Sequence, residues 1–240
     1  MSRLLNKEYR LNISGRDIPV RLRRNRLARK LILRTETSRP DSKFGVVLTL
    51  PNDISELKAF NWVKTQIHWI NLQLQKSPER VVFKDGIIIP LCGVNHVVRH
   101  RPSARRGVWA EEGLINVSGQ IEYLPRRLTD WLKKQARKII TERVTEKAAA
   151  ANANYGRISV RDTRTRWGSC SSNGNLNFSW RLILAPHYVF DYVVAHEVAH
   201  LLEHNHGTQF WKLVDTLTDE RKRASAWLVR YGSDLHRYGG

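Results

Sequence analysis

The pentapeptide H-E-x-x-H at residues 196–200 constrains the fold of this chain more than any other feature of its sequence. It lies within a run whose apolar residues recur at helical spacing: Phe190, Val194, Val198, Leu201 and Leu202. On a helix, the second histidine lies about 40° from the first and one turn further along. His196 and His200 can therefore approach one metal ion from the same side, while Val198 faces the core.

Glu197 occupies a different line of the same predicted helix. It lies about 60° from His200, on the same half of the helix. Because of this offset, its carboxylate does not lie on the side of the helix where His196 and His200 approach the metal, but it stays close enough to hold an attacking water. The position predicts a general base.

A catalytic zinc site needs a third protein ligand and an open fourth position. If the helix continued unbroken, His204 would lie about 6 Å beyond His200 along the axis, too far to share a metal with His196. Asn205 and Gly207 favour a helix end at this point, after which His206 can fold back. The sequence therefore favours His206 over His204 as the third ligand of Zn2+.

The first half of the chain has the pattern of a β-rich module, expected over residues 1–120. Apolar and alternating runs within residues 18–50, interrupted by a polar turn at 38–43, predict a small antiparallel sheet. Asp53 followed by Glu56 resembles a helix N-cap with its capping-box partner, so one helix is expected over about residues 53–76. Short strands are expected between residues 81 and 117.

The second half, expected to form the catalytic domain over residues 121–240, has a different pattern. The apolar spacing after Pro125 predicts a long amphipathic helix. An alternation then predicts a strand over residues 175–184 with one apolar face: Leu176, Phe178, Trp180, Leu182 and Leu184. This strand directly precedes the helix of the H-E-x-x-H motif. Together the two halves predict an α+β fold.

Two blocks of the sequence resemble a known family. R-W-G-S-C-S at residues 166–171 and H-E-V-A-H at 196–200, followed by Asn205-His206 and Phe210-Trp211, resemble the motifs of the bacterial YgjP-like metallopeptidases. That family is related to the SprT-like and WLM zinc proteases of the zincin group. Val198 stands where leucine is usual and Gly207 where serine is usual, and neither change removes a ligand or the base.

The resemblance implies a zincin-like zinc metallopeptidase that acts on a peptide or protein substrate. It assigns His196, His200 and His206 as metal ligands and Glu197 as the catalytic residue, in agreement with the helix geometry. Phe210 and Trp211 are expected to pack beneath the metal.

Further site residues are expected with an alternative beside each. By resemblance and position, the strand 175–184 is the candidate to pair with extended substrate, through Asn175 and Asn177; the alternative is an interior strand. Tyr188 and Tyr192 can donate to a tetrahedral oxyanion, or can simply pack. Cys170 as a fourth zinc ligand would close the site and make the metal structural.

The chain is strongly basic, with 41 Lys and Arg against 22 Asp and Glu and a formal charge of +19. Residues 1–34 hold eleven of the basic residues against only Glu8 and Asp17. This excess favours contact with a polyanion through the N-terminal module, although a solvated strand face has the same composition. Together with the SprT-like relationship that the resemblance implies, this charge gives the alternative function: a nucleic-acid-associated, SprT-like protease, or a basic nucleic-acid-binding protein with a structural zinc.

The composition of the chain indicates the cellular compartment in which we expect the protein. The 41% hydrophobic and 26% charged residues are typical of globular chains, and no apolar run is long enough to cross a bilayer. The first residues lack the apolar segment of a secretory signal, and Cys92 and Cys170 lie far apart, as in proteins of reducing compartments. We therefore expect a cytoplasmic protein without a membrane partner.

Overall fold

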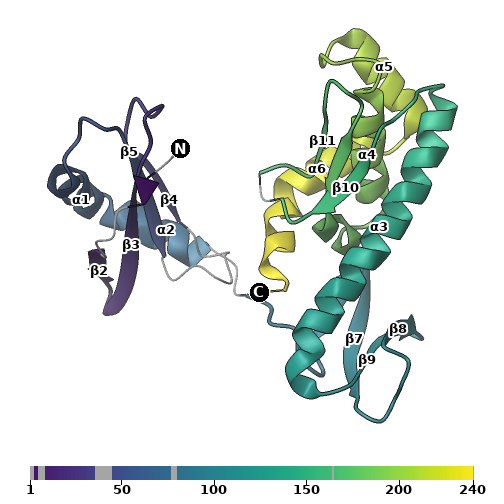
Figure 1. The fold of residues 1–240 in the computed structure, drawn as a ribbon, viewed down its shortest axis with the longest axis horizontal. Helices are drawn as coiled ribbons and strands as arrows, with labels where there is room; N and C mark the ends of the chain where they lie inside the picture. The colour runs from purple at the N-terminus through teal and green to yellow at the C-terminus, as the bar shows by residue number, and fades with distance from the viewer. Residues whose placement is uncertain (1–2, 5–8, 36–44, 77–79, 164, 240) are drawn as a thin grey trace. The chain divides into compact units, whose positions relative to one another are not determined.

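The computed structural model describes residues 3–4, 9–35, 45–76, 80–163 and 165–239 (Figure 1). The polar turn expected at 38–43 lies outside the described residues, as does Lys7. The chain divides into two compact units, Met1–Arg80 and Val81–Gly239. This division comes earlier than the expected boundary at residue 120, because Ile89, Val98 and Ile115 belong to the same buried core as the second half.

The first unit contains a five-stranded sheet and two helices. Its strands are β1 (Arg3–Leu4), β2 (Tyr9–Ile13), β3 (Arg16–Arg24), β4 (Ile32–Thr35) and β5 (Val46–Leu50). The order is β1-β3-β5-β4, with β2 also paired to β3. The prediction of an antiparallel sheet is wrong for its central pair, since β3 and β5 run parallel.

The helical part of this unit also differs from the prediction. A break at Gln66 separates α1 (Glu56–Thr65) from α2 (Ile67–Lys76), in place of one continuous helix. The N-cap is Ser55, whose hydroxyl accepts the backbone N–H of Lys58 at 3.3 Å, rather than Asp53. Buried residues of both helices share one core with the inner face of the sheet, which includes Val20, Leu22, Val46, Leu48, Ala59, Val63 and Ile70.

The second unit begins with a four-stranded sheet in the order β6-β7-β9-β8. Its strands are β6 (Ile88–Leu91), β7 (Val94–Arg101), β8 (Val108–Glu111) and β9 (Leu114–Ser118). After the short helix η1 (Ile121–Tyr123), Pro125 opens the long helix α3 (Leu124–Ala150), as expected from its fixed backbone angle. In Figure 1, α3 runs from the sheet of β7 and β9 to the region of α4.

The remaining elements build the candidate site. A three-stranded sheet has the order β10-β12-β11, from β10 (Ile158–Arg161), β11 (Gly168–Cys170) and β12 (Leu176–Ser179). The 3-10 helix η2 (Trp180–Leu184) follows, and then α4 (His187–Ala199), α5 (Thr208–Leu217), α6 (Arg221–Tyr231) and η3 (Gly232–Arg237). The predicted strand 175–184 is therefore wrong beyond Ser179.

The predicted α+β class is confirmed, since the described residues form three separate sheets together with six α-helices. Across the described residues, no helix is both long enough and apolar enough to span a bilayer.

Candidate metal centre

The end of α4 and the segment after it bring three imidazole rings together. The ring centroids of His196, His200 and His206 lie 4.7–5.1 Å apart, and their candidate ligand atoms all lie within 4.8 Å of one another. α4 ends at Ala199 with His200 as its C-cap, earlier than the end expected near residues 205–207. The chain turns immediately, and His206 returns with its Nε2 3.2 Å from Nε2 of His196.

The nitrogen atoms fit a zinc ion in spacing and in protonation. Two ligands at about 2.0–2.1 Å from a tetrahedral ion are about 3.3 Å apart, close to the 3.2 Å between His196 and His206. His200 donates its Nδ1 proton to the carbonyl of Glu203 at 2.9 Å, which leaves Nε2 free to coordinate. Burial, followed by repulsion from His200 and His206, lowers the pKa of His196 to about 4, so this ring is the neutral ligand form.

Glu197 lies beside this cluster with its side chain turned into the protein. The residue is 6% exposed, and its carboxylate accepts a hydrogen bond from the backbone N–H of Cys170. Burial raises the pKa of Glu197 to about 7, although Arg166 and the Cys170 N–H act in the opposite direction. A carboxyl group with a pKa near neutrality can both accept and return a proton at neutral pH.

Gly168 on β11 makes the space that this carboxylate occupies. A Cβ atom built on Gly168 would lie 2.5 Å from Cγ and Oε1 of Glu197 and 2.7 Å from its Cδ. The backbone of Gly168 is outside the left-handed region, so the requirement is for volume. This role could not be predicted from the sequence, because nothing in the R-W-G-S-C segment indicates that residue 168 faces residue 197.

Two contacts from outside the motif hold α4 in position. Lys147 of α3 is buried, and its Nζ lies 2.9 Å from the carboxylate of Asp191 on α4. The turn of Cys92 and Gly93, between β6 and β7, packs on Pro186 at the start of α4. A Cβ atom at Gly93, whose φ is +80°, would lie 2.8 Å from Cα of Pro186. The first sheet of this unit thus supports the helix that carries the histidines.

Of the two asparagines expected to bind substrate, Asn177 lies on the interior strand β12, whereas Asn175 is exposed in the turn before it. β12 has β10 on one side and β11 on the other, so the expectation of a free edge is wrong and the interior alternative is correct. Asn175 accepts the backbone N–H of Arg157 at 2.8 Å and so holds the turn before β12. Asn177 is paired with Ser159 on β10 and Ser169 on β11.

The two tyrosines separate into different environments. Tyr192 lines a pocket with His196 and Glu197, and its ring lies 5.9 Å from that of His196. Burial is the main cause that raises the pKa of Tyr192, so its hydroxyl group keeps its proton at neutral pH. Tyr188 is instead covered by the guanidinium of Arg223, 4.0 Å from the ring centre.

The other candidate ligands stay outside the cluster. Among the residues that the structure describes, the group that could hold a metal ion contains His196, His200 and His206, without Cys170 or His204. The Cys170 thiol instead donates to the carbonyl of Ser171 at 3.4 Å. This arrangement gives no support to a closed, four-ligand structural site.

Phe210 and Trp211 pack against the histidine rings, as expected. The centroid of Phe210 lies 4.5–5.0 Å from the centroids of all three rings. Trp211 lies 5.9 Å from His196 and 5.7 Å from His206. These aromatic contacts restrict the rotamers of the imidazoles, which favours a preformed metal centre.

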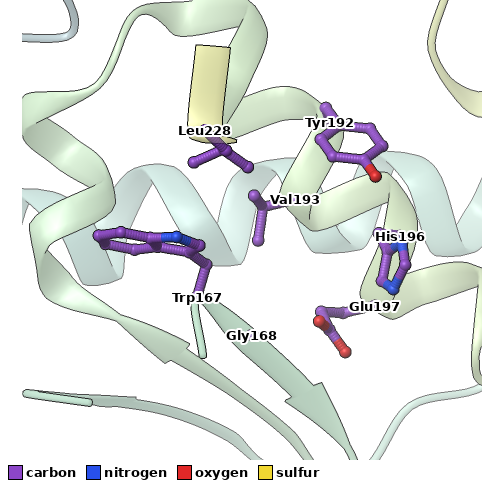
Figure 2. Close-up of a pocket in the computed structure, with 7 residues that line it drawn as sticks. All are labelled: Trp167, Gly168, Tyr192, Val193, His196, Glu197 and Leu228. Carbon is purple, nitrogen blue, oxygen red and sulfur yellow. The ribbon is translucent and has the colours of Figure 1, made fainter. Parts of the chain in front are cut away.

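A pocket of about 190 Å3 opens beside Glu197 (Figure 2). Three imidazoles and the buried carboxylate of Glu197 thus adjoin a pocket, and the imidazoles form a group that could hold a metal ion. A family model described as YgjP-like, metallopeptidase domain, matches residues 34–231. The chain belongs to this YgjP-like metallopeptidase family.

Two solved structures also show similarity to part of the chain. The crystal structure of the metallopeptidase zymogen of Methanocaldococcus jannaschii jannalysin is 18% identical, with a TM-score of 0.35; the match covers 38% of this chain and 94% of that one. For the metallopeptidase zymogen of Pyrococcus abyssi abylysin, the identity is 17% and the TM-score 0.35, over 42% of this chain and 99% of that one. No curated protein matches the chain.

Proposed function

We propose that this protein is a zinc-dependent peptidase in which His196, His200 and His206 hold Zn2+ and Glu197 is the general base. The observation that carries the proposal is the convergence of three ring nitrogens beside a buried carboxylate whose pKa is about 7. Zinc bound at such a site polarises a peptide carbonyl and lowers the pKa of water. Glu197 accepts the proton of the attacking water and returns it to the leaving amine.

We assign a hydrogen bond to the developing oxyanion to Tyr192. Its raised pKa keeps the phenol protonated at neutral pH, and it lines the same pocket as His196 and Glu197. A donor directed at an oxyanion stabilises the transition state more than the ground state.

We propose that extended substrate pairs with the edge strand β11 in place of the interior strand β12. Trp167 accepts the N–H of Ser179, and Ser171 donates to Asn175, so residues 167, 169 and 171 direct their backbone groups toward β12. In an antiparallel pair the intervening residues point the other way. Gly168 and the carbonyl of Cys170 therefore direct their backbone groups away from β12, while the Cys170 N–H is bonded to the Glu197 carboxylate. This edge offers backbone partners to a peptide strand.

Zinc removal tests this function. Treatment with a chelator should abolish peptide cleavage, and one equivalent of Zn2+ should restore it, because the proposed mechanism needs Zn2+ bound to the three histidines. Cleavage is followed by mass spectrometry of peptide mixtures, and zinc content by elemental analysis. Activity that persists in protein shown to be free of metal would contradict the proposal.

We propose nucleic-acid binding as a second function, favoured by an arginine face in the first unit. Residues 1–80 hold 17 Lys and Arg against 7 Asp and Glu, a net +10, while the remaining 160 residues hold 24 against 15, a net +9. Val20 and Leu22 face the core, so Arg21 and Arg23 lie on the opposite face of β3. Arg34 on β4 shares that face, since Val47 is the cross-strand partner of both Arg21 and Arg34.

Guanidinium groups on one sheet face suit phosphates, which they bind as a fork. Replacing Arg21, Arg23 and Arg34 by alanine should weaken binding to duplex DNA or RNA and lower the slope of log K against log salt by about 2.7, at about 0.9 per contact. The matched control replaces Lys133, Lys134 and Lys138 on the exposed face of α3, with the same loss of charge. Titrations at several salt concentrations measure both. Equal effects, or salt-insensitive binding, would make the arginine face a solvated strand surface.

A further inference from the structure

We infer that the pocket beside Glu197 selects substrates by binding a bulky apolar side chain next to the scissile bond, and that Trp167 and Leu228 determine this selection. The inference rests on the proposed peptidase function and specifies its substrate class. The pocket is lined by Trp167, Gly168, Tyr192, Val193, His196, Glu197 and Leu228.

The lining residues divide into a reacting end and an apolar end. In Figure 2, His196 and Glu197 lie together at one side, while Trp167, Leu228 and Val193 gather on the other. The apolar end combines three elements: Trp167 precedes β11, Val193 belongs to α4 and Leu228 to α6. A side chain that enters from a peptide held at Glu197 therefore meets an aromatic and aliphatic surface.

The volume sets the size of the side chain. An apolar cavity of about 150 Å3 can hold a benzene molecule, so about 190 Å3 accommodates a phenyl ring or a branched aliphatic group. A methyl group would leave most of this space without contacts. A single methylene in an apolar pocket changes discrimination by about 10–200-fold, so phenylalanine and leucine should exceed alanine by at least tenfold.

The charge of the pocket excludes the other large side chains. Among the described residues of the lining, Glu197 is the one with a formal charge, and its negative form repels an aspartate or glutamate side chain. A lysine ammonium group would have to share the Glu197 carboxylate with the Cys170 N–H, which that carboxylate already accepts. Placing that ammonium group among Trp167, Val193 and Leu228 would also remove its water without supplying further acceptors.

The wall formed by Trp167 is held by the C-terminal part of the second unit. The indole stacks on the ring of His236 at 4.9 Å and 20°, and Gly232 lies beside it, where an added Cβ would be in van der Waals contact at 3.4 Å. A fixed wall makes the pocket preformed, and a preformed pocket discriminates by shape.

Arg181 anchors this C-terminal part from the interior. It is 2% exposed, and its guanidinium forms two hydrogen bonds with Asp162, at 2.9 and 3.1 Å. It also donates to the carbonyl of Leu235 at 3.3 Å and to that of Tyr238. Arg181 is thus a positioning residue for η3 and, through His236, for the wall at Trp167.

The test uses peptides that are identical except at one position beside the cleaved bond, which carries Phe, Leu, Ala, Lys or Glu. Wild type should cleave the Phe and Leu peptides with kcat/KM at least tenfold above the Ala peptide. Leu228→Phe fills the pocket and should reverse the order of Phe and Ala, while Trp167→Ala removes the wall and should lower the Phe-to-Ala ratio at least tenfold. Trp227→Ala, a neighbour on α6 outside the lining, is the matched control and should keep the wild-type ratio.

A binding measurement separates this inference from the peptidase function. Calorimetry with zinc-loaded Glu197→Gln protein should give the same order, with the Phe peptide bound at least tenfold more tightly than the Ala peptide. The order of the Phe and Ala peptides should reverse in the Glu197→Gln, Leu228→Phe double variant, as in the kinetic test, so the test remains if Trp167→Ala does not fold. If wild type cleaves nothing but this order holds, the peptidase function fails and the pocket stands. Equal binding of all peptides, a preference for Lys, or an order unchanged by Leu228→Phe would overturn the inference.

Discussion

Replacing Glu197 by glutamine is expected to lower kcat for peptide hydrolysis about a hundredfold to ten-thousandfold while zinc stays bound. The amide has the size of the carboxylate, and its oxygen can still accept the Cys170 N–H. It cannot accept a proton from water. The loss should therefore fall on kcat, with little change in KM. Steady-state kinetics and elemental analysis of the same preparations measure both quantities.

Glu142→Gln provides the control, because Glu142 is an exposed glutamate on α3. This variant should keep full activity. Loss of zinc from Glu197→Gln would make Glu197 a ligand and contradict the assignment of the general base. Undiminished turnover would remove Glu197 from the mechanism altogether.

Replacing His206 by alanine is expected to reduce zinc affinity by more than about a hundredfold, beyond the 10–100-fold cost typical for loss of a residue that only orients a ligand. His206 is one of three residues in the cluster, and two imidazoles alone do not make a zinc site of the usual kind. His204→Ala should keep the affinity, because His204 is exposed and stays outside that cluster. Competition titrations with a chelator of known affinity give both values.

The comparison of these two histidines is sharp because they are two residues apart in one turn. Equal loss of zinc from both variants would contradict the assignment of His206. A loss confined to His204→Ala would move the third ligand and would require a different path of the chain after Ala199.

The histidine cluster could be predicted because its geometry is local. His196 and His200 are one helical turn apart, and His206 follows within six residues, so helix geometry and the requirements of zinc coordination were sufficient to predict that these three rings meet. The early end of α4 at Ala199 did not alter that result, since His206 still returns to the end of the helix.

The region 180–184 could not be predicted in the same way. Alternation assigned Trp180, Leu182 and Leu184 to one strand face and Arg181 to a polar face, yet all five residues of η2 are buried. Arg181 is compensated by Asp162, nineteen positions earlier, and by carbonyl groups of the C-terminal part. Because all five residues are buried, their alternation of polar and apolar types does not indicate which side of the segment faces solvent.

In general, the contacts that could not be predicted from the sequence are those between segments far apart in the chain. The parallel pairing of β3 with β5, the packing of Cys92 and Gly93 on Pro186 and the contact of Gly168 with Glu197 all join residues that are far apart in sequence. Composition and periodicity constrain each partner separately, but they do not state which partners meet.

The contact between Gly168 and Glu197 also determines which replacements the chain can accept. Glycine weakens a strand, so a search for stabilising substitutions would choose alanine at this position, and the backbone there would permit it. The three atoms nearest to the added Cβ all belong to the Glu197 side chain, Cγ among them, so the collision would fall on this buried side chain rather than on the backbone. Screening variants by thermal stability alone would therefore retain a change that displaces the proposed base. At position 168, selection for stability and selection for activity therefore favour different residues.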